Sequence, residues 1–354
     1  MPLGFDTSVA GYFRLVRPLL FRLDPELAHE LARPILASAP LCRRLGGGPV
    51  TDPRLSVQLG PLILPNPIGL APGFDKNARM AAGLAELGFG HLTLGTVMPT
   101  ARAGNPRPRI VRRPGEGAMV NAMGLPSEGL ELFARRLKRL RAPVPVIASI
   151  GAADDEGYER AFRQLQPLVA AIEVNLRCNN DRDDSGNYLK PDSFERMMRR
   201  LMPYRRVPVF VKINDWQNEG EHRDRLEVVA RGLALGVDGF CTLSVLRVEE
   251  SGLSVGRGNL TGRPLLPRTL QAIRDIREVT RGRAAIRARG GITTGADAFA
   301  AIAAGAATVE LFTAFVYRGW AVARQINDEL LDEMAANGVR DLHELVGRGT
   351  AAAA

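Results

Sequence analysis

Short apolar runs alternate with helix-like stretches from residue 66 onward. Eight such runs occur, at residues 67–73, 91–96, 144–149, 171–175, 207–213, 238–243, 284–288 and 307–312. Because the runs are continuously apolar, they are typical of strands that are buried on both faces in a parallel sheet. Helical spacing of apolar residues appears between most of them, at residues 77–87, 128–140, 194–201, 223–235, 265–279 and 296–304.

Eight β/α repeats within about 250 residues predict an α/β protein with a closed (β/α)8 TIM barrel, whose active site lies at the C-terminal strand ends. An open, doubly wound sheet is the alternative, but no Gly-rich dinucleotide fingerprint follows the first run. We therefore place a barrel domain at residues 49–348 and a small helical extension at residues 1–48.

The extension contains two short amphipathic patterns. The first runs from about Val9 to Phe21, and Asp24-Pro25 then reads as an N-cap with proline in the first turn of the second. Arginines flank both patterns. Such helices either dock on a bilayer surface or pack on the main domain, and the pattern alone favours packing.

Composition narrows the function classes. The chain has 354 residues, of which 45% are hydrophobic and 24% charged, as in a soluble globular protein. It lacks the ~18 consecutive apolar residues of a spanning helix and an export signal, so we expect a cytoplasmic protein. The net charge is +9, but the arginines are scattered without interleaved aromatic residues, which argues against nucleic acid. The three cysteines and four histidines show no ligand spacing, so we expect no metal site.

Polar residues collect just after the apolar runs, where a barrel active site would form. Glycines at 290–291 and the segment 311–315 suggest a phosphate site, with an ordinary turn as the alternative. Lys212 either forms a Schiff base, as in an aldolase, or holds the anionic part of a cofactor. Cys178, beside Asn175 and Asn180, is a nucleophile, a general base or a small buried filler.

Nearly the whole chain resembles the dihydroorotate dehydrogenases, closest to the quinone-linked, membrane-associated class. The stretch NPIGLAPGFDKNARMAAGLAELGFGHLTLGTVMPTARAGNPRPRIVR at residues 66–112 carries the strongest similarity. NAMG (121–124), EVN (173–175), VKI (211–213), GNLTGRPL (258–265) and GGI (290–292) follow in the family's order. The N-terminal helices also look like that class's membrane-docking, quinone-admitting extension, which raises surface docking above simple packing.

The resemblance implies an FMN enzyme of pyrimidine biosynthesis that oxidises dihydroorotate to orotate. It implies a quinone as electron acceptor and peripheral contact of residues 1–45 with the inner face of the cell membrane. FMN would contact Ala71, Pro72, Gly73, Thr96, Ser149, Asn175, Lys212, Gly262, Gly291, Phe312 and Thr313. The substrate would contact Lys76, Asn121, Asn175, Asn180 and Ser244, and Cys178 would be the catalytic base.

Departures from the family's pattern cluster on the substrate side. Cys178 occupies a position that is serine in the quinone-linked class and cysteine in the soluble class, and Ser244-Val245 stands where an asparagine-threonine pair is usual. Leu125 replaces a phenylalanine, and the lid reads DRDDSG at residues 181–186. Three alternatives therefore remain: a family member with another substrate, a catalytically silent flavin-binding or empty barrel, and a phosphate-sugar aldolase that uses Lys212.

Overall fold

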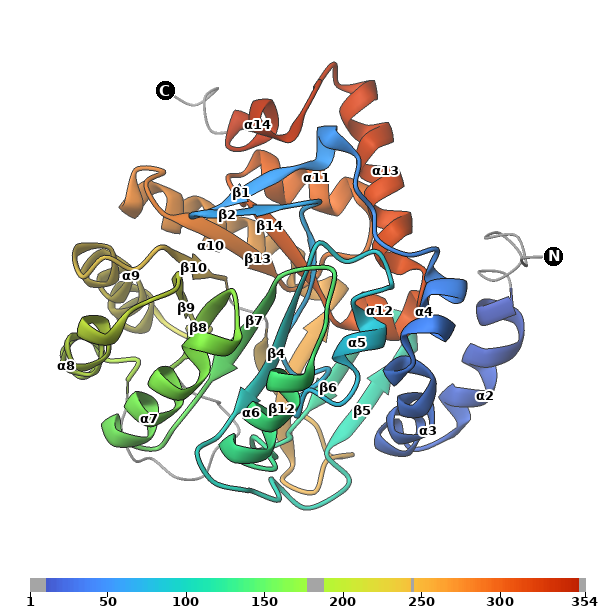
Figure 1. The fold of residues 1–354 in the computed structure, drawn as a ribbon, viewed down its shortest axis with the longest axis horizontal. Helices are drawn as coiled ribbons and strands as arrows, with labels where there is room; N and C mark the ends of the chain where they lie inside the picture. The colour runs from blue at the N-terminus through green and yellow to red at the C-terminus, as the bar shows by residue number, and fades with distance from the viewer. Residues whose placement is uncertain (1–10, 177–187, 243–244, 350–354) are drawn as a thin grey trace.

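The computed structural model describes residues 11–176, 188–242 and 245–349. Within this part of the chain, eight parallel strands close into a barrel surrounded by helices (Figure 1). The prediction of a (β/α)8 barrel is confirmed. In order around the barrel the strands are β3 (Ile68–Leu70), β4 (His91–Val97), β7 (Val146–Ile150), β8 (Ala171–Asn175), β9 (Val209–Lys212), β10 (Gly239–Cys241), β13 (Ala285–Arg289) and β14 (Thr308–Leu311), and β14 pairs with β3.

The outer helices bury their apolar faces against the strands. They are α5 (Ala81–Leu84), α6 (Leu130–Arg139), α7 (Asp155–Leu165), α8 (Pro191–Leu201), α9 (Glu219–Ala234), α10 (Leu266–Thr280), α11 (Gly295–Ala303), α12 (Thr313–Arg318), α13 (Val322–Ala336) and α14 (Leu342–Leu345). Helix α9 begins four residues earlier than expected because the Asn218 side chain caps it by accepting from the Glu221 N–H, at 2.9 Å. Helix α5 is shorter than the predicted 77–87, since Asp75 binds the N–H groups of Arg79 and Met80 in the preceding loop.

The N-terminal extension forms a π-helical turn (Tyr12–Val16), α2 (Arg17–Arg22), α3 (Pro25–Ala37) and α4 (Ala39–Gly46). Asp24 caps α3 as predicted, accepting from the Glu26 and Leu27 N–H groups at 3.0 Å. Arg109, in the segment before β5 (Ile110–Arg113), donates to both carboxylate oxygens of Glu26 at 2.8 and 3.0 Å. This bidentate pair fixes α3 against the segment that leads into β5, and Figure 1 shows α3 beside β5. No helix in the described ranges has the length and apolar character to cross a bilayer.

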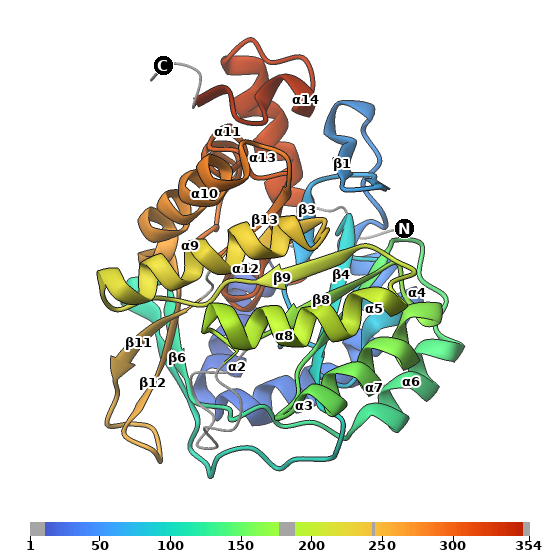
Figure 2. The same ribbon diagram turned by 90° about the vertical axis from the view of Figure 1, so that its left-hand side faces the viewer.

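Two antiparallel sheets lie at the ends of the barrel, and the pattern of eight apolar runs predicted neither of them. We call the four-stranded one the accessory sheet. Strands β5, β6 (Ala118–Asn121), β11 (Leu246–Glu249) and β12 (Arg257–Gly262) form a sheet in the order β11-β12-β6-β5. This sheet lies at the C-terminal mouth of the barrel, near α2 and α3 (Figure 2). The hairpin β1 (Val57–Leu59) and β2 (Leu62–Leu64) lies at the opposite end, where Gly60 approaches Asp238.

Four charged side chains cross the barrel interior. Glu173 on β8 and Glu310 on β14 project from opposite walls, and Arg287 and Arg289 on β13 each contact both carboxylates. All four side chains are at most 2% exposed. Burial alone would raise the pKa of Glu173, but the positive charges of Arg289 and Arg287 outweigh burial and lower it. The barrel core is therefore held together in part by ion pairs, which we call the Arg–Glu quartet.

Replacing Glu173 by glutamine should strongly destabilise the fold, because Arg287 and Arg289 would lose a buried counter-charge. We expect the free energy of unfolding in urea to fall by about 3 kcal/mol or more. Glu344→Gln, which removes a carboxylate that pairs with exposed Arg340, is the control and should leave the urea midpoint nearly unchanged. Equal shifts of the two midpoints would contradict a stabilising role of the quartet.

Candidate functional site

A cavity of ≈ 180 Å³ lies at the C-terminal mouth of the barrel. Most residues that the sequence assigns to cofactor and substrate meet in its wall, although they come from segments far apart in the chain. These are Ala71, Pro72, Gly73, Lys76, Thr96, Asn121, Asn175, Lys212, Gly262, Gly291, Phe312 and Thr313. The sequence therefore predicted where the cavity lies, while their individual roles stay predictions.

Two glycines shape one end of this cavity. Gly262 has φ +104, and a Cβ there would lie 2.4 Å from the Gly117 carbonyl oxygen. Gly291 has φ +83, and its Cβ would lie 2.3 Å from the Leu266 backbone nitrogen. Only glycine tolerates such backbone angles and such close approach. Both glycines also line the cavity, so at this end a ligand would meet backbone, which suits an anionic group such as phosphate.

A chain of hydrogen bonds runs from the cavity into the barrel core. The Asn175 amide donates to the Thr96 hydroxyl at 2.9 Å, and the Thr96 and Ser149 hydroxyls lie 2.9 Å apart. Ser149 then donates to Glu173 at 3.0 Å. Ser149 is fully buried behind Thr96 and is absent from the cavity lining, so the structure places it as support for Thr96 rather than at the cavity surface.

Two lysines bring positive charge to the cavity. Lys212, at the end of β9, is partly exposed and lines it. Lys76 donates to the Gly73 carbonyl oxygen at 2.6 Å, within the loop that Asp75 holds in place. Lys212 is thus only partly buried by its apolar neighbours, and it lines the cavity. Both cations are suited to anionic groups of a ligand.

Three predicted site residues, Cys178, Asn180 and Ser244, lie outside the described residues. The cavity also contains residues that the sequence did not single out, among them Asn214, Asn259, Thr261, Arg289 and Glu310. Glu310 lies inside an apolar run and Arg289 directly follows one, so the sequence pattern did not mark either as a site residue. Asn259 and Thr261 alternate along β12, a strand that was not predicted.

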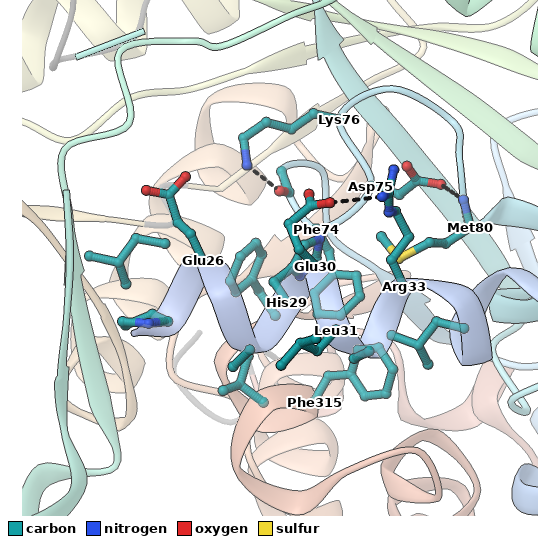
Figure 3. Close-up of a pocket in the computed structure, with 18 of the residues that line it drawn as sticks. Glu26, His29, Glu30, Leu31, Arg33, Phe74, Asp75, Lys76, Met80 and Phe315 are labelled. Carbon is teal, nitrogen blue, oxygen red and sulfur yellow. Dashed lines mark hydrogen bonds and ion pairs between the residues drawn. The ribbon is translucent and has the colours of Figure 1, made fainter. Parts of the chain in front are cut away.

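A second, larger cavity of ≈ 480 Å³ lies between the N-terminal helices and the barrel. Figure 3 shows α3 crossing it, with His29 near Phe74 and with Phe315 on the barrel side. Burial, together with the positive charges of Lys76 and Arg33, lowers the pKa of His29 to about 4, so its ring is neutral at neutral pH. Six residues line both cavities: Gly73, Lys76, Ile110, Met119, Met123 and Phe312. The two cavities therefore share a wall.

The mouth cavity fits a flavin nucleotide better than a metal. The side-chain carbonyl oxygen of Asn175 is buried and has no hydrogen-bond partner in the described chain. A ligand ring with N–H donors could supply one. Glycine backbone suits the phosphate, and lysine suits an electron-rich ring edge. No group of three or more His, Cys, Asp or Glu within the described ranges could hold a metal ion.

Comparison with known proteins supports this fold and shows the family. The family model described as dihydroorotate dehydrogenase matches residues 54–334. A dihydroorotate dehydrogenase (quinone) of Roseiflexus sp. is 37% identical, covering 96% of this chain and 99% of the relative, and one of Acidithiobacillus ferrooxidans is 35% identical, covering 93% and 97%. The crystal structure of DHODH from Eimeria tenella in complex with ferulenol has a TM-score of 0.81 and 29% identity, covering 92% of this chain and 95% of that chain.

The fold and these similarities therefore define a barrel oxidoreductase that acts on CH–CH donors. The chain belongs to the dihydroorotate dehydrogenase family, whose members depend on a flavin.

The glycine end of the cavity can be tested by adding one methyl group. Gly262→Ala should lower the fraction of protein that binds flavin and destabilise the fold by about 1–3 kcal/mol, because φ +104 is strained for alanine and its Cβ meets the Gly117 carbonyl. Gly115→Ala, where a Cβ meets nothing within 4 Å, is the control. Flavin content from the absorbance ratio and urea midpoints measure both effects. Unaltered flavin binding in Gly262→Ala would contradict a ligand at this end.

Proposed function

We propose that this protein oxidises dihydroorotate to orotate with FMN and passes the electrons to a quinone. The observation that carries the proposal is the pair of cavities that share a wall. The mouth cavity, which we call the polar side, gathers lysine and asparagine side chains, and the larger cavity beside the extension, which we call the apolar cavity, has a mostly apolar lining. A flavin between them could be reduced from the polar side and reoxidised from the apolar side.

The residues of the mouth cavity divide into two groups under this proposal. Gly262 and Gly291 would bind the FMN phosphate, and Lys212 would balance negative charge on the isoalloxazine ring. Bound FMN supplies a hydride acceptor. On the substrate side, Lys76 would pair with the carboxylate, while Asn121 and Asn175 would orient the ring through hydrogen bonds. Cys178, outside the described residues, would remove the proton next to the departing hydride.

The apolar cavity is the proposed quinone site. Aliphatic and aromatic side chains form most of its lining, although charged residues such as Arg109 and Arg112 also line it. Its wall includes Met119 and Phe312, which also border the mouth cavity. A quinone ring placed there would lie close to the flavin edge. His29, neutral because of its lowered pKa, could donate a hydrogen bond to a quinone carbonyl without adding a charge to this apolar site.

The proposal extends to peripheral contact with the inner face of the cell membrane. Leu15, Leu19, Leu27, Leu31 and Ile35 are exposed on the extension, and Leu15 is 68% exposed. Arg14, Arg22 and Arg44 lie in the same segment. An apolar surface bordered by cations is suited to anionic lipid, and it would place the apolar cavity near membrane-dissolved quinone.

A family member with a different substrate remains the second candidate. Leu125 and Val245 line the mouth cavity and offer no side-chain hydrogen bond. A site built from fewer polar contacts would accept another cyclic amide acid. Anaerobic addition of dihydroorotate separates the two candidates, because dihydroorotate would leave the flavin of the second candidate oxidised.

The primary test is the flavin spectrum under anaerobic conditions. The yellow protein should bleach within seconds of adding dihydroorotate. Cys178→Ala should keep its flavin but lower the rate of bleaching by about 100-fold or more, because a general base typically contributes 10²–10⁴-fold. Cys178→Ser keeps a group able to accept the proton, so its rate of bleaching should lie between those of the wild type and Cys178→Ala. A Cys178→Ala variant that bleaches at the normal rate would rule out this residue as the base.

The quinone site can be tested by filling the apolar cavity. Ala32→Phe adds a ring to the α3 face that lines this cavity, so the KM for a soluble quinone analogue should rise by about tenfold while reduction of a small dye stays unchanged. Leu27→Ala changes an exposed residue on the same helix that lies outside the cavity lining, and it should alter neither rate in detergent. Parallel losses with quinone and dye in Ala32→Phe would count against a separate quinone site.

A further inference from the structure

One wall of the mouth cavity is formed by the accessory sheet. Strand β12 pairs antiparallel with β6, so that Asn259 lies opposite Asn121 and Gly262 lies opposite Ala118. Leu260 packs into a small apolar cluster with Ala118 and Val120. Because side chains alternate along a strand, Asn259 and Thr261 face the other way, and both line the mouth cavity.

Asn259 is an unsatisfied amide in this wall. Its side chain is 5% exposed, and its Oδ1 has no hydrogen-bond partner in the described chain. Its backbone carbonyl oxygen, by contrast, lies 3.4 Å from the Asn121 amide nitrogen. Burying a carbonyl oxygen without a donor costs free energy unless a ligand supplies one. Asn175, across the cavity on β8, presents a second such oxygen.

The position of Asn259 along β12 indicates which ligand it meets. Gly262, three residues further on, belongs to the glycine end that suits a phosphate. Asn259 lies at the other end, paired with Asn121, and Val245 nearby in the lining offers no hydrogen-bonding group. An N–H donor at this end would belong to a small ring rather than to the phosphate arm of a cofactor.

We propose that Asn259 determines substrate specificity: its side-chain carbonyl accepts a hydrogen bond from a ring N–H of the substrate beside Asn121. This inference rests on the proposed function, in which the substrate is a cyclic amide acid with two ring N–H groups. Thr261, the other side chain of β12 that lines the cavity, could not take over this contact. Its hydroxyl already bonds to the Met119 carbonyl and the Thr313 hydroxyl, each at 3.1 Å.

The test measures how tightly orotate and its two N-methylated forms bind to flavin-loaded protein. Binding is detected as a shift of the flavin absorbance. In the wild type, methylation at the contacted nitrogen should weaken binding. Asn259→Ala should weaken orotate binding by about tenfold and leave the affinity for that methylated form unchanged, because the lost hydrogen bond is already absent there. The flavin dissociation constant should change less than twofold.

Asn259→Asp keeps an acceptor of the same shape. It should retain the preference for orotate over the methylated form, even if the added negative charge weakens both. This ratio of affinities is a readout that misfolding or general loosening of the cavity would not preserve.

Each other outcome overturns the inference in a recognisable way. Equal losses for orotate and both methylated forms would mean that Asn259 only supports the cavity wall. A weaker flavin complex with unchanged orotate binding would assign the contact to the cofactor, and no change in either would assign it to water. A wild type that neither bleaches with dihydroorotate nor binds orotate would overturn the proposed function as well, whereas the other outcomes leave that function standing.

Discussion

The Arg–Glu quartet is the constraint on which the site depends. Glu173 and Glu310 stand on opposite walls of the barrel, and the two arginines between them fix the distance across it. Buried ion pairs are stable only when every charge is matched, so the four strands β8, β13, β14 and, through Thr93, β4 hold a common register. Arg289 and Glu310 also form the floor of the mouth cavity. The same contacts that close the barrel therefore set the depth of the site.

Two elements outside the eight-stranded barrel lie above this floor, the accessory sheet and the N-terminal extension. The accessory sheet supplies Asn121 and Asn259 from one side, and the extension covers the other side with α2 and α3. Arg109 joins them, because it precedes β5 and binds Glu26 on α3. The shared wall of the two cavities follows from this arrangement, since residues of the sheet and of the loop after β3 lie between them.

Much of this architecture was readable in the sequence, and the exceptions have physical reasons. All eight barrel strands were found because their residues are buried on both faces and form continuous apolar runs. The accessory strands were not predicted, because β12 is a short strand that carries two glycines and the polar residues Asn259 and Thr261, and so forms no apolar run. The Arg–Glu quartet was not predicted, because a single charged residue in or beside an apolar run does not show that it meets another charge across a barrel. Twelve of the predicted site residues line the mouth cavity, while their roles stay predictions, and the resemblance contributed more to that list than the pattern did.

The floor and the wall of the mouth cavity differ in the partners of their buried oxygens. In the quartet each carboxylate meets two guanidinium groups, and Ser149, Thr93 and His91 add hydrogen bonds to the carboxylates. One layer higher, Asn175 and Asn259 leave carbonyl oxygens without partners although both are buried. A buried side-chain carbonyl oxygen without a donor costs stability. Both of these oxygens lie on residues that line the mouth cavity, so a ligand with N–H donors would recover the cost of leaving them unmatched.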